Sequence, residues 1–172
     1  MEIKVEESSV MMSGDVVGFE CEALRTILAS SKIETVVLAN SRGGNAEAGY
    51  CVGTLIREHG ISTSITGSCN SSCSRMWLGG VSRVLTNGNS RVGLHGNYGR
   101  GGALLPEAPS RLRSWIPRYA PAVDRSLMEQ WIKLPTNSHM MYFYRDHAEV
   151  CDGRECVPIP ARNARNAGLS TN

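Results

Sequence analysis

The feature that most constrains the fold is an alternation of strand-like and helix-like segments over the first hundred residues. Residues 34–39 (Glu-Thr-Val-Val-Leu-Ala) are β-branched and apolar, as in a buried strand. Residues 48–56 repeat apolar side chains at the i, i+3, i+4 spacing of an amphipathic helix, and residues 61–66 alternate as a strand. Because strands separated by helices form parallel sheets with helical crossovers, the pattern predicts an α/β fold whose mainly parallel sheet is flanked by helices.

The remaining segments extend this order along the chain. Gly60 is a natural stop for the helix that precedes it, and Pro117 and Pro121 predict two helices around a kink. Further elements are expected as strands at 10–12, 83–85 and 91–94 and as helices at 19–29 and 124–134.

Length and composition favour one globular domain. A chain of 172 residues with 41% hydrophobic residues can bury a real core. We expect residues 1–160 to form this domain. Residues 161–172 are rich in Asn, Gly, Ser and Thr and are expected to form a flexible tail.

Charge and hydropathy exclude several classes of function. The net charge of +2, without a Lys/Arg cluster, argues against a nucleic-acid partner. No segment approaches the roughly 18 apolar residues of a spanning helix, although this leaves membrane association open. The charged N-terminus lacks the apolar region of a signal peptide. This start fits a cytoplasmic protein, and it equally fits a mature exported domain that carries a new Met1.

Six cysteines bear on the cellular compartment. Cys151 and Cys156 bracket a polar, loop-like stretch, where a local disulfide would indicate an oxidising compartment. Cys21 and Cys51 fall on apolar helix faces and are expected to be buried thiols. The periplasm or a secreted location is therefore favoured over the cytoplasm.

The other cysteine pair, Cys69 and Cys73, lies four residues apart. If the intervening residues are helical, this spacing brings the Cα atoms near disulfide range, and two buried thiols are the alternative. Neither this pair nor Cys151 and Cys156 has the CxxC spacing of zinc ribbons and fingers, so no metal and no other cofactor is expected.

Three chemically suggestive features follow expected strands. Gly43-Gly44 comes just after residues 34–39, Ser71 comes a few residues after 61–66, and His95 ends 91–94. Ligand sites in parallel α/β sheets lie beyond the carboxyl ends of the strands. The three features therefore predict one site at this edge of the sheet.

Together these residues suit nucleophilic catalysis. Serine becomes nucleophilic when a base accepts its proton, and His95 can be that base for Ser71. The N–H groups of Gly44 and Ser72, from separate loops, could form an oxyanion hole. Taken singly, a Gly-Gly pair is usually a turn, a serine at a helix start is usually an N-cap, and a histidine at a strand end is usually structural.

The combination resembles the Clp-protease/crotonase superfamily, most closely its ClpP-like serine protease branch. The resemblance lies in Leu38–Gly49, in Gly67–Ser72 and in Ser90–His95, and Cys69-Asn-Ser-Ser-Cys73 is similar to the C-x-S-x-C form of predicted periplasmic ClpP-like proteins. It implies stacked β-α-β units and a homo-oligomer that acts on a peptide or protein substrate. It also implies that Ser71 is the nucleophile, His95 the general base, and Gly44 and Ser72 the oxyanion donors. Gly43, Asn45 and Gly96 are the expected substrate-binding residues.

The third catalytic residue departs from the family pattern. The family places an aspartate in the region after the histidine, and here Asn137 falls near that position. Asp124 and Asp146 are the nearest carboxylates in the sequence. The nucleophile has an alternative as well, because Ser72 could take that role and Ser71 the cap.

Three functions remain open from the sequence. The first is an acyl-enzyme peptidase. The second is a crotonase-type enzyme acting on a CoA thioester, although no paired glutamates stand at the helix starts. The third is a catalytically silent ClpP-like binding or assembly domain. The glycine-rich stretch at 96–102 lacks the lysine of a phosphate loop, and we expect a flexible lid or a substrate-edge segment there, next to His95.

Overall fold

The computed structural model describes residues 1–99 and 101–172 and shows one nine-stranded sheet in this part of the chain. The strand order is β1-β2-β3-β4-β6-β7-β8-β9, and β5 pairs with β4 outside this path. The strands are β1 (Glu2–Glu6), β2 (Ser9–Ser13), β3 (Thr35–Ser41), β4 (Ser62–Asn70), β5 (Arg83–Leu85), β6 (Arg91–Leu94), β7 (His139–Phe143), β8 (Ala148–Asp152) and β9 (Glu155–Pro158). The helices are α1 (Glu20–Ser30), α2 (Ala46–Glu58), α3 (Ser72–Leu78), α4 (Ala108–Tyr119) and α5 (Arg125–Ile132).

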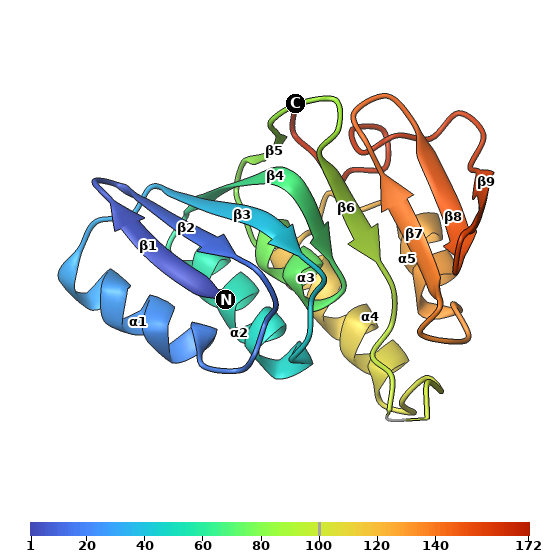
Figure 1. Ribbon diagram of the computed structural model, residues 1–172, viewed down its shortest axis with the longest axis horizontal. Helices are drawn as coiled ribbons and strands as arrows, with labels where there is room; N and C mark the ends of the chain where they lie inside the picture. Colours follow the sequence, from blue (N-terminus) through green and yellow to red (C-terminus); the bar gives the residue numbers. More distant parts are fainter. Residues whose placement is uncertain (100) are drawn as a thin grey trace.

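The centre of the sheet is parallel, as the alternating sequence pattern predicts. Strands β2, β3, β4 and β6 pair in parallel, while β1 and the β7–β9 strands add antiparallel edges. Helices α1, α2 and α3 gather on one face of these strands (Figure 1). The expectation of an α/β fold with a mainly parallel sheet flanked by helices is confirmed.

The core lies between the sheet and its helices. On β2, Val10 and Met12 are fully buried while Met11 between them is 37% exposed, so one face of this strand meets the helices. Helix α3 is buried along its whole length, which places it at the centre of the molecule. The segment that follows the Ser71 loop is therefore held rigidly from all sides.

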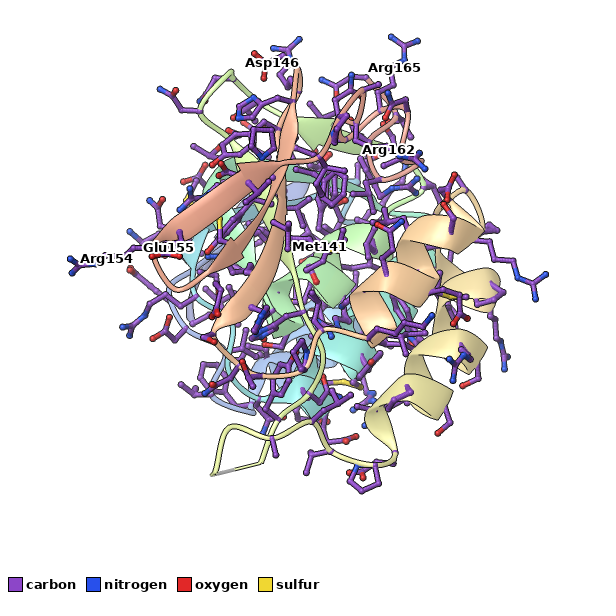
Figure 2. All side chains as sticks on the ribbon, turned by 90° about the vertical axis from the view of Figure 1, so that its right-hand side faces the viewer. Met141, Asp146, Arg154, Glu155, Arg162 and Arg165 are labelled. Atoms are coloured by element: carbon purple, nitrogen blue, oxygen red, sulfur yellow. A yellow bond between two sulfur atoms is a disulfide. The ribbon has the colours of Figure 1, made fainter. Side chains whose placement is uncertain are left out.

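Several strands were absent from the sequence prediction. Strand β1 is largely exposed and lacks a buried alternation, and β9 is exposed at every position. Strand β7 does contribute to the core, because the Met141 side chain lies between the sheet and the helices (Figure 2) and is 3% exposed. Of the two prolines expected to separate the helices, Pro121 lies in the break between α4 and α5, whereas α4 continues through Pro117 to Tyr119.

The C-terminal segment corrects the expectation of a flexible tail at 161–172. Ala164, Ala167 and Leu169 are fully buried. The Thr171 N–H donates to the Arg83 carbonyl at 2.9 Å, which ties the end of the chain to β5. The segment looks polar in sequence, but its few apolar side chains fill a gap in the core.

Three disulfides link the six cysteines: Cys21–Cys51, Cys69–Cys73 and Cys151–Cys156. The local bridge at 151–156 agrees with the sequence expectation, and the bridge at 69–73 is one of the two alternatives that the sequence left open. The expectation of free thiols at Cys21 and Cys51 is wrong, because α1 packs beside α2 and brings their Cα atoms within 5.8 Å. Three bridges are compatible with an extracytoplasmic, oxidising location.

The bridges lead to a direct measurement. Titration of thiols in denaturant without reductant is expected to find none, since the three bridges account for all six cysteines. Addition of reductant before the titration should release six. The detection of free thiols in the unreduced, denatured protein would contradict the pairing.

Across the described residues, no helix is both long enough and apolar enough to cross a membrane.

Candidate active site

The carboxyl ends of β3, β4 and β6 lie at one edge of the sheet, as expected for parallel neighbours (Figure 1). The loops that leave these ends bring Gly44, Ser71 and His95 to a cleft of about 340 Å³. The cleft is lined by Arg42, Gly44, Ala46, Ser71, His95, Gly96, Asn97, Tyr98, Gly99, Leu105 and Asn137. The single site predicted from the sequence is therefore assembled by the fold.

Ser71 and His95 are in direct contact. The Ser71 Oγ lies 2.6 Å from the His95 Nε2. Ser71 has φ 54° and ψ −124°, an uncommon backbone conformation for a residue with a side chain, and its hydroxyl makes no N-cap hydrogen bond to α3. The hydroxyl is thus turned away from the helix and toward the histidine, the geometry that nucleophile activation needs.

Ser72 occupies a different environment. It is 2% exposed, and its Oγ is buried without a hydrogen-bond partner among the described residues. A Cβ placed on Gly49 would lie 2.9 Å from the Ser72 Cβ, so this side chain packs against α2. Of the two neighbouring serines, Ser71 is the one that faces both His95 and the cleft.

The Gly43-Gly44 loop approaches the Ser71 loop too closely for side chains. A Cβ on Gly43 would lie 2.5 Å from the Ser71 Cβ and 3.0 Å from the Ser72 nitrogen, and one on Gly44 would lie 2.1 Å from the Val16 carbonyl oxygen. Both glycines have positive φ, 92° and 139°. Among the described residues, neither the Gly44 N–H nor the Ser72 N–H donates to a protein acceptor. Two unpaired donors from separate loops are thus available at this edge of the sheet.

The environment of His95 keeps its imidazole neutral. Burial, reinforced by the positive charge of Arg75, lowers the pKa of His95 from 6.5 to about 4. The main chain of Asn137 and His139 opposes this shift in part. No described group meets hydrogen-bond geometry at Nδ1. A neutral ring that carries its proton on Nδ1 leaves Nε2 free to accept the Ser71 proton.

None of the candidate third residues places its side chain on His95. The Asn137 side chain lies beside Gly102, where an added Cβ would come within 3.0 Å of its Oδ1, so the expected hydrogen bond to His95 is absent. Asp124 instead caps α5 through the Leu127 N–H. Asp146 pairs with His147, and Figure 2 shows it at the outer end of the β7–β8 connection. Of these three residues, Asn137 alone influences His95, because its main chain, together with that of His139, raises the His95 pKa.

Of the three expected substrate-binding residues, Gly43, Asn45 and Gly96, one lines the cleft. Gly96 lines the cleft. Asn45 does not line it, because its Oδ1 accepts the Ala48 N–H at 2.9 Å and caps α2. Gly43 stands behind Ser71 rather than in the open cleft. The substrate role expected for Asn45 is thus replaced by a helix cap.

The stretch expected to be a lid forms one wall of the cleft. Tyr98 bridges to Leu104 in a short antiparallel contact, and its hydroxyl donates to the Leu134 carbonyl at 3.1 Å. Its ring packs on the His95 ring with centroids 4.9 Å apart. Arg100, within this stretch, lies outside the described residues.

Two residues that contact Ser71 or His95 are not identified by the sequence analysis. Tyr98 restricts the His95 ring, and Arg75 is bonded to the main chain on both sides of the site. Arg75 carries a faint sequence signal. It follows Ser71 by four residues, the spacing of neighbours on a helix, in a segment otherwise composed of small and apolar residues.

A larger cavity of about 450 Å³ lies between α4 and α5. Its lining includes Pro117, Pro121 and Met128 but none of the residues that meet at Ser71. Chemistry rather than size therefore identifies the cleft at Ser71 as the candidate site.

Comparison with known proteins finds solved structures with a similar fold. No protein-family model matches the chain, and no curated protein sequence is detectably similar to it. Among solved structures, ClpP1 from Listeria monocytogenes is 18% identical with a TM-score of 0.59, over 95% of this chain and 89% of that one. A peptidase from Plasmodium falciparum is 14% identical with a TM-score of 0.59, over 96% and 94%. A mutant of the 1510-N membrane-bound stomatin-specific protease is 13% identical with a TM-score of 0.57, over 95% and 76%. The chain thus has a ClpP-like fold.

Proposed function

We propose that this protein is a serine peptidase that cleaves peptide bonds through an acyl-enzyme. The observation that carries the proposal is the 2.6 Å contact between the Ser71 Oγ and the His95 Nε2, inside a cleft at the carboxyl edge of the sheet. The peptidases and proteases among the structural neighbours support peptides as the substrate class.

In the proposed mechanism, Ser71 attacks the substrate carbonyl while His95 accepts the hydroxyl proton at Nε2. The carbonyl oxygen becomes an oxyanion, which the Gly44 and Ser72 N–H groups stabilise. His95 then gives the proton to the leaving amine, and water repeats the sequence to release the acyl group. No cofactor is needed for these steps.

His95 would act without a carboxylate behind it. In the transition state its ring becomes cationic, and an acid partner would ordinarily stabilise that cation. Here the main chain of His139 and of Asn137 favours the cationic ring by raising the His95 pKa, although neither meets hydrogen-bond geometry at Nδ1. We therefore assign the positioning role at Asn137 to its main chain rather than to its side chain.

A fluorophosphonate probe tests the proposal across pH. The intact protein is expected to form one adduct, which mass spectrometry of peptides should locate at Ser71. Because His95 must be neutral to accept a proton, the labelling rate should rise with pH through about 4 and level off above it.

An unperturbed histidine would instead give a midpoint near its ordinary value of 6.5. Circular dichroism at each pH separates loss of activity from unfolding. Such a check is needed because a lowered histidine pKa removes stability as pH falls from about 6.5 toward 4. Failure of the folded protein to label at any pH would refute the peptidase.

A catalytically silent ClpP-like assembly domain is the second candidate. It is favoured by the His95 Nδ1, which has no hydrogen-bond partner in the part of the chain that the structure describes, because a histidine without an acid partner is a weaker base. The same probe separates the two functions, since the silent domain would fold normally and leave Ser71 unlabelled.

We also propose that the protein works in the periplasm or as a secreted protein, and as a homo-oligomer. The three disulfides support the location. The ClpP-like fold supports self-association, and light scattering of the purified protein measures it directly.

A further inference from the structure

The guanidinium of Arg75 lies between the two halves of the proposed catalytic pair. Its Nη1 donates to the Ser71 carbonyl at 2.6 Å, and its Nη2 donates to the His95 carbonyl at 2.6 Å. Weaker contacts reach the Ser74 Oγ at 3.2 Å and the Asn97 Oδ1 at 3.4 Å. One rigid planar group therefore joins the loop after β4 to the loop after β6.

The packing of Arg75 fixes this group in place. The residue is 1% exposed and forms no ion pair with a carboxylate among the described residues. Its guanidinium instead lies 4.9 Å from the Trp131 ring centroid and 5.6 Å from that of Tyr50. A buried cation without an acid partner is costly to keep, so stability alone gives a weak reason for an arginine here.

We propose that Arg75 is a positioning residue of this site, and that its guanidinium holds the main chain of Ser71 and the main chain of His95 at the spacing that lets their side chains react. The proposal rests on the peptidase function proposed above. In this proposal a buried arginine keeps Ser71 and His95 at the correct spacing. A third side chain behind the histidine does not have this role.

Arg75 also adds to the effect of burial in keeping His95 neutral. The groups that face the ring are Arg75 from α3, Ser71, Tyr98 from the cleft wall, and the main chain of Asn137 and His139. The His139 side chain is directed to Thr136 and Asp152, and Arg42 at the cleft pairs with Asp15. Since Arg75 is the charged group that lowers the His95 pKa, removing its charge should raise that pKa.

The test compares Arg75 with a matched buried arginine. Arg83 is 3% exposed and also donates to main-chain carbonyls, those of Gly80, Gly168 and Leu169, but it lies outside the cleft. The variants are Arg75→Met, Arg75→Lys, Arg83→Met and Arg83→Lys. The readouts are the fluorophosphonate labelling rate from pH 3 to 9 and the titration of His95 by NMR.

We expect Arg75→Met to slow labelling about 100-fold, the effect of a small misplacement of reacting groups. We also expect it to move the His95 midpoint measurably upward from about 4, because the charge that adds to the effect of burial is removed. Arg75→Lys should keep the midpoint but label about 10-fold more slowly, because an ammonium cannot bridge two carbonyls as a planar fork does. Folded Arg83 variants should keep both the wild-type labelling rate and the wild-type midpoint.

Wild-type labelling and an unchanged midpoint in Arg75→Met would overturn the proposal, as would equal changes in the folded Arg75 and Arg83 variants. If Arg75→Met does not fold, Arg75→Lys decides, and labelling at the wild-type rate overturns the proposal. If the wild-type protein does not label, the peptidase proposal fails by itself. The NMR midpoint in Arg75→Met then decides whether Arg75 sets the state of His95.

Discussion

Replacement of Ser71 by alanine is expected to lower the turnover of an activated ester or peptide by roughly 10⁵-fold, since it removes the hydroxyl that contacts His95 and is proposed to be the nucleophile. That ratio corresponds to about 7 kcal/mol of transition-state stabilisation. The variant should fold normally, because the Ser71 hydroxyl makes no helix-capping bond. Its hydrolysis rate is measured against wild type at equal protein concentration, together with fluorophosphonate labelling, which should disappear.

Ser72→Ala is the companion variant for this experiment. Its side chain is buried away from the cleft, and the substitution keeps the N–H that is proposed to bind the oxyanion. We expect its activity to stay within about tenfold of wild type, far above that of Ser71→Ala. The reverse order of the two variants would make Ser72 the nucleophile and contradict the assignment of Ser71.

The placement of Ser71 beside His95 could be predicted because it depends on topology. Hydrophobic periodicity distinguishes strands from helices, and the carboxyl ends of parallel strands must share one edge. Gly44, Ser71 and His95 each follow such a strand, so their convergence needs no knowledge of side-chain packing. The fold class follows from the same pattern.

Residues whose roles depend on packing between distant segments could not be predicted in this way. In sequence, Arg75 is one basic residue in a short apolar helix. Its partners at Ser71 and His95 become visible only when the loops after β4 and β6 meet. For Asn45 the sequence position is misleading in the opposite way. It follows the glycine pair and so is expected in the site, but its side chain accepts the Ala48 N–H and caps α2.

The same limit explains the errors at Cys21, Cys51 and the C-terminal segment. Periodicity shows that Cys21 and Cys51 lie on apolar helix faces, but not that the two helices face each other. The polar composition of residues 161–172 conceals the burial of Ala164, Ala167 and Leu169 against the rest of the core. In both cases the deciding contact spans a long stretch of sequence, and local pattern carries no information on it.

Gly43→Ala is expected to reduce activity about 100-fold although it alters no reacting group. An added Cβ would lie 2.5 Å from the Ser71 Cβ and 2.7 Å from the Asn70 carbonyl oxygen, both far inside contact distance. The nucleophile loop must therefore move, and displacements of this size typically cost about that factor in rate. The free energy of unfolding should also fall, by about 1–3 kcal/mol for the positive φ and by a similar amount for the overlap. Enzyme kinetics and urea denaturation measure the two effects separately.

Gly14→Ala separates backbone strain from displacement of Ser71. Gly14 has φ 83°, close to the 92° of Gly43, but nothing lies within 4 Å of a Cβ placed there. Its alanine variant should lose only the strain contribution to stability, about 1–3 kcal/mol, and should keep near wild-type activity. If Gly14→Ala and Gly43→Ala lose activity equally, strain or general destabilisation is responsible. If only Gly43→Ala loses it, the glycine is required because the Gly43-Gly44 loop must lie closer to Ser71 than any side chain at position 43 allows.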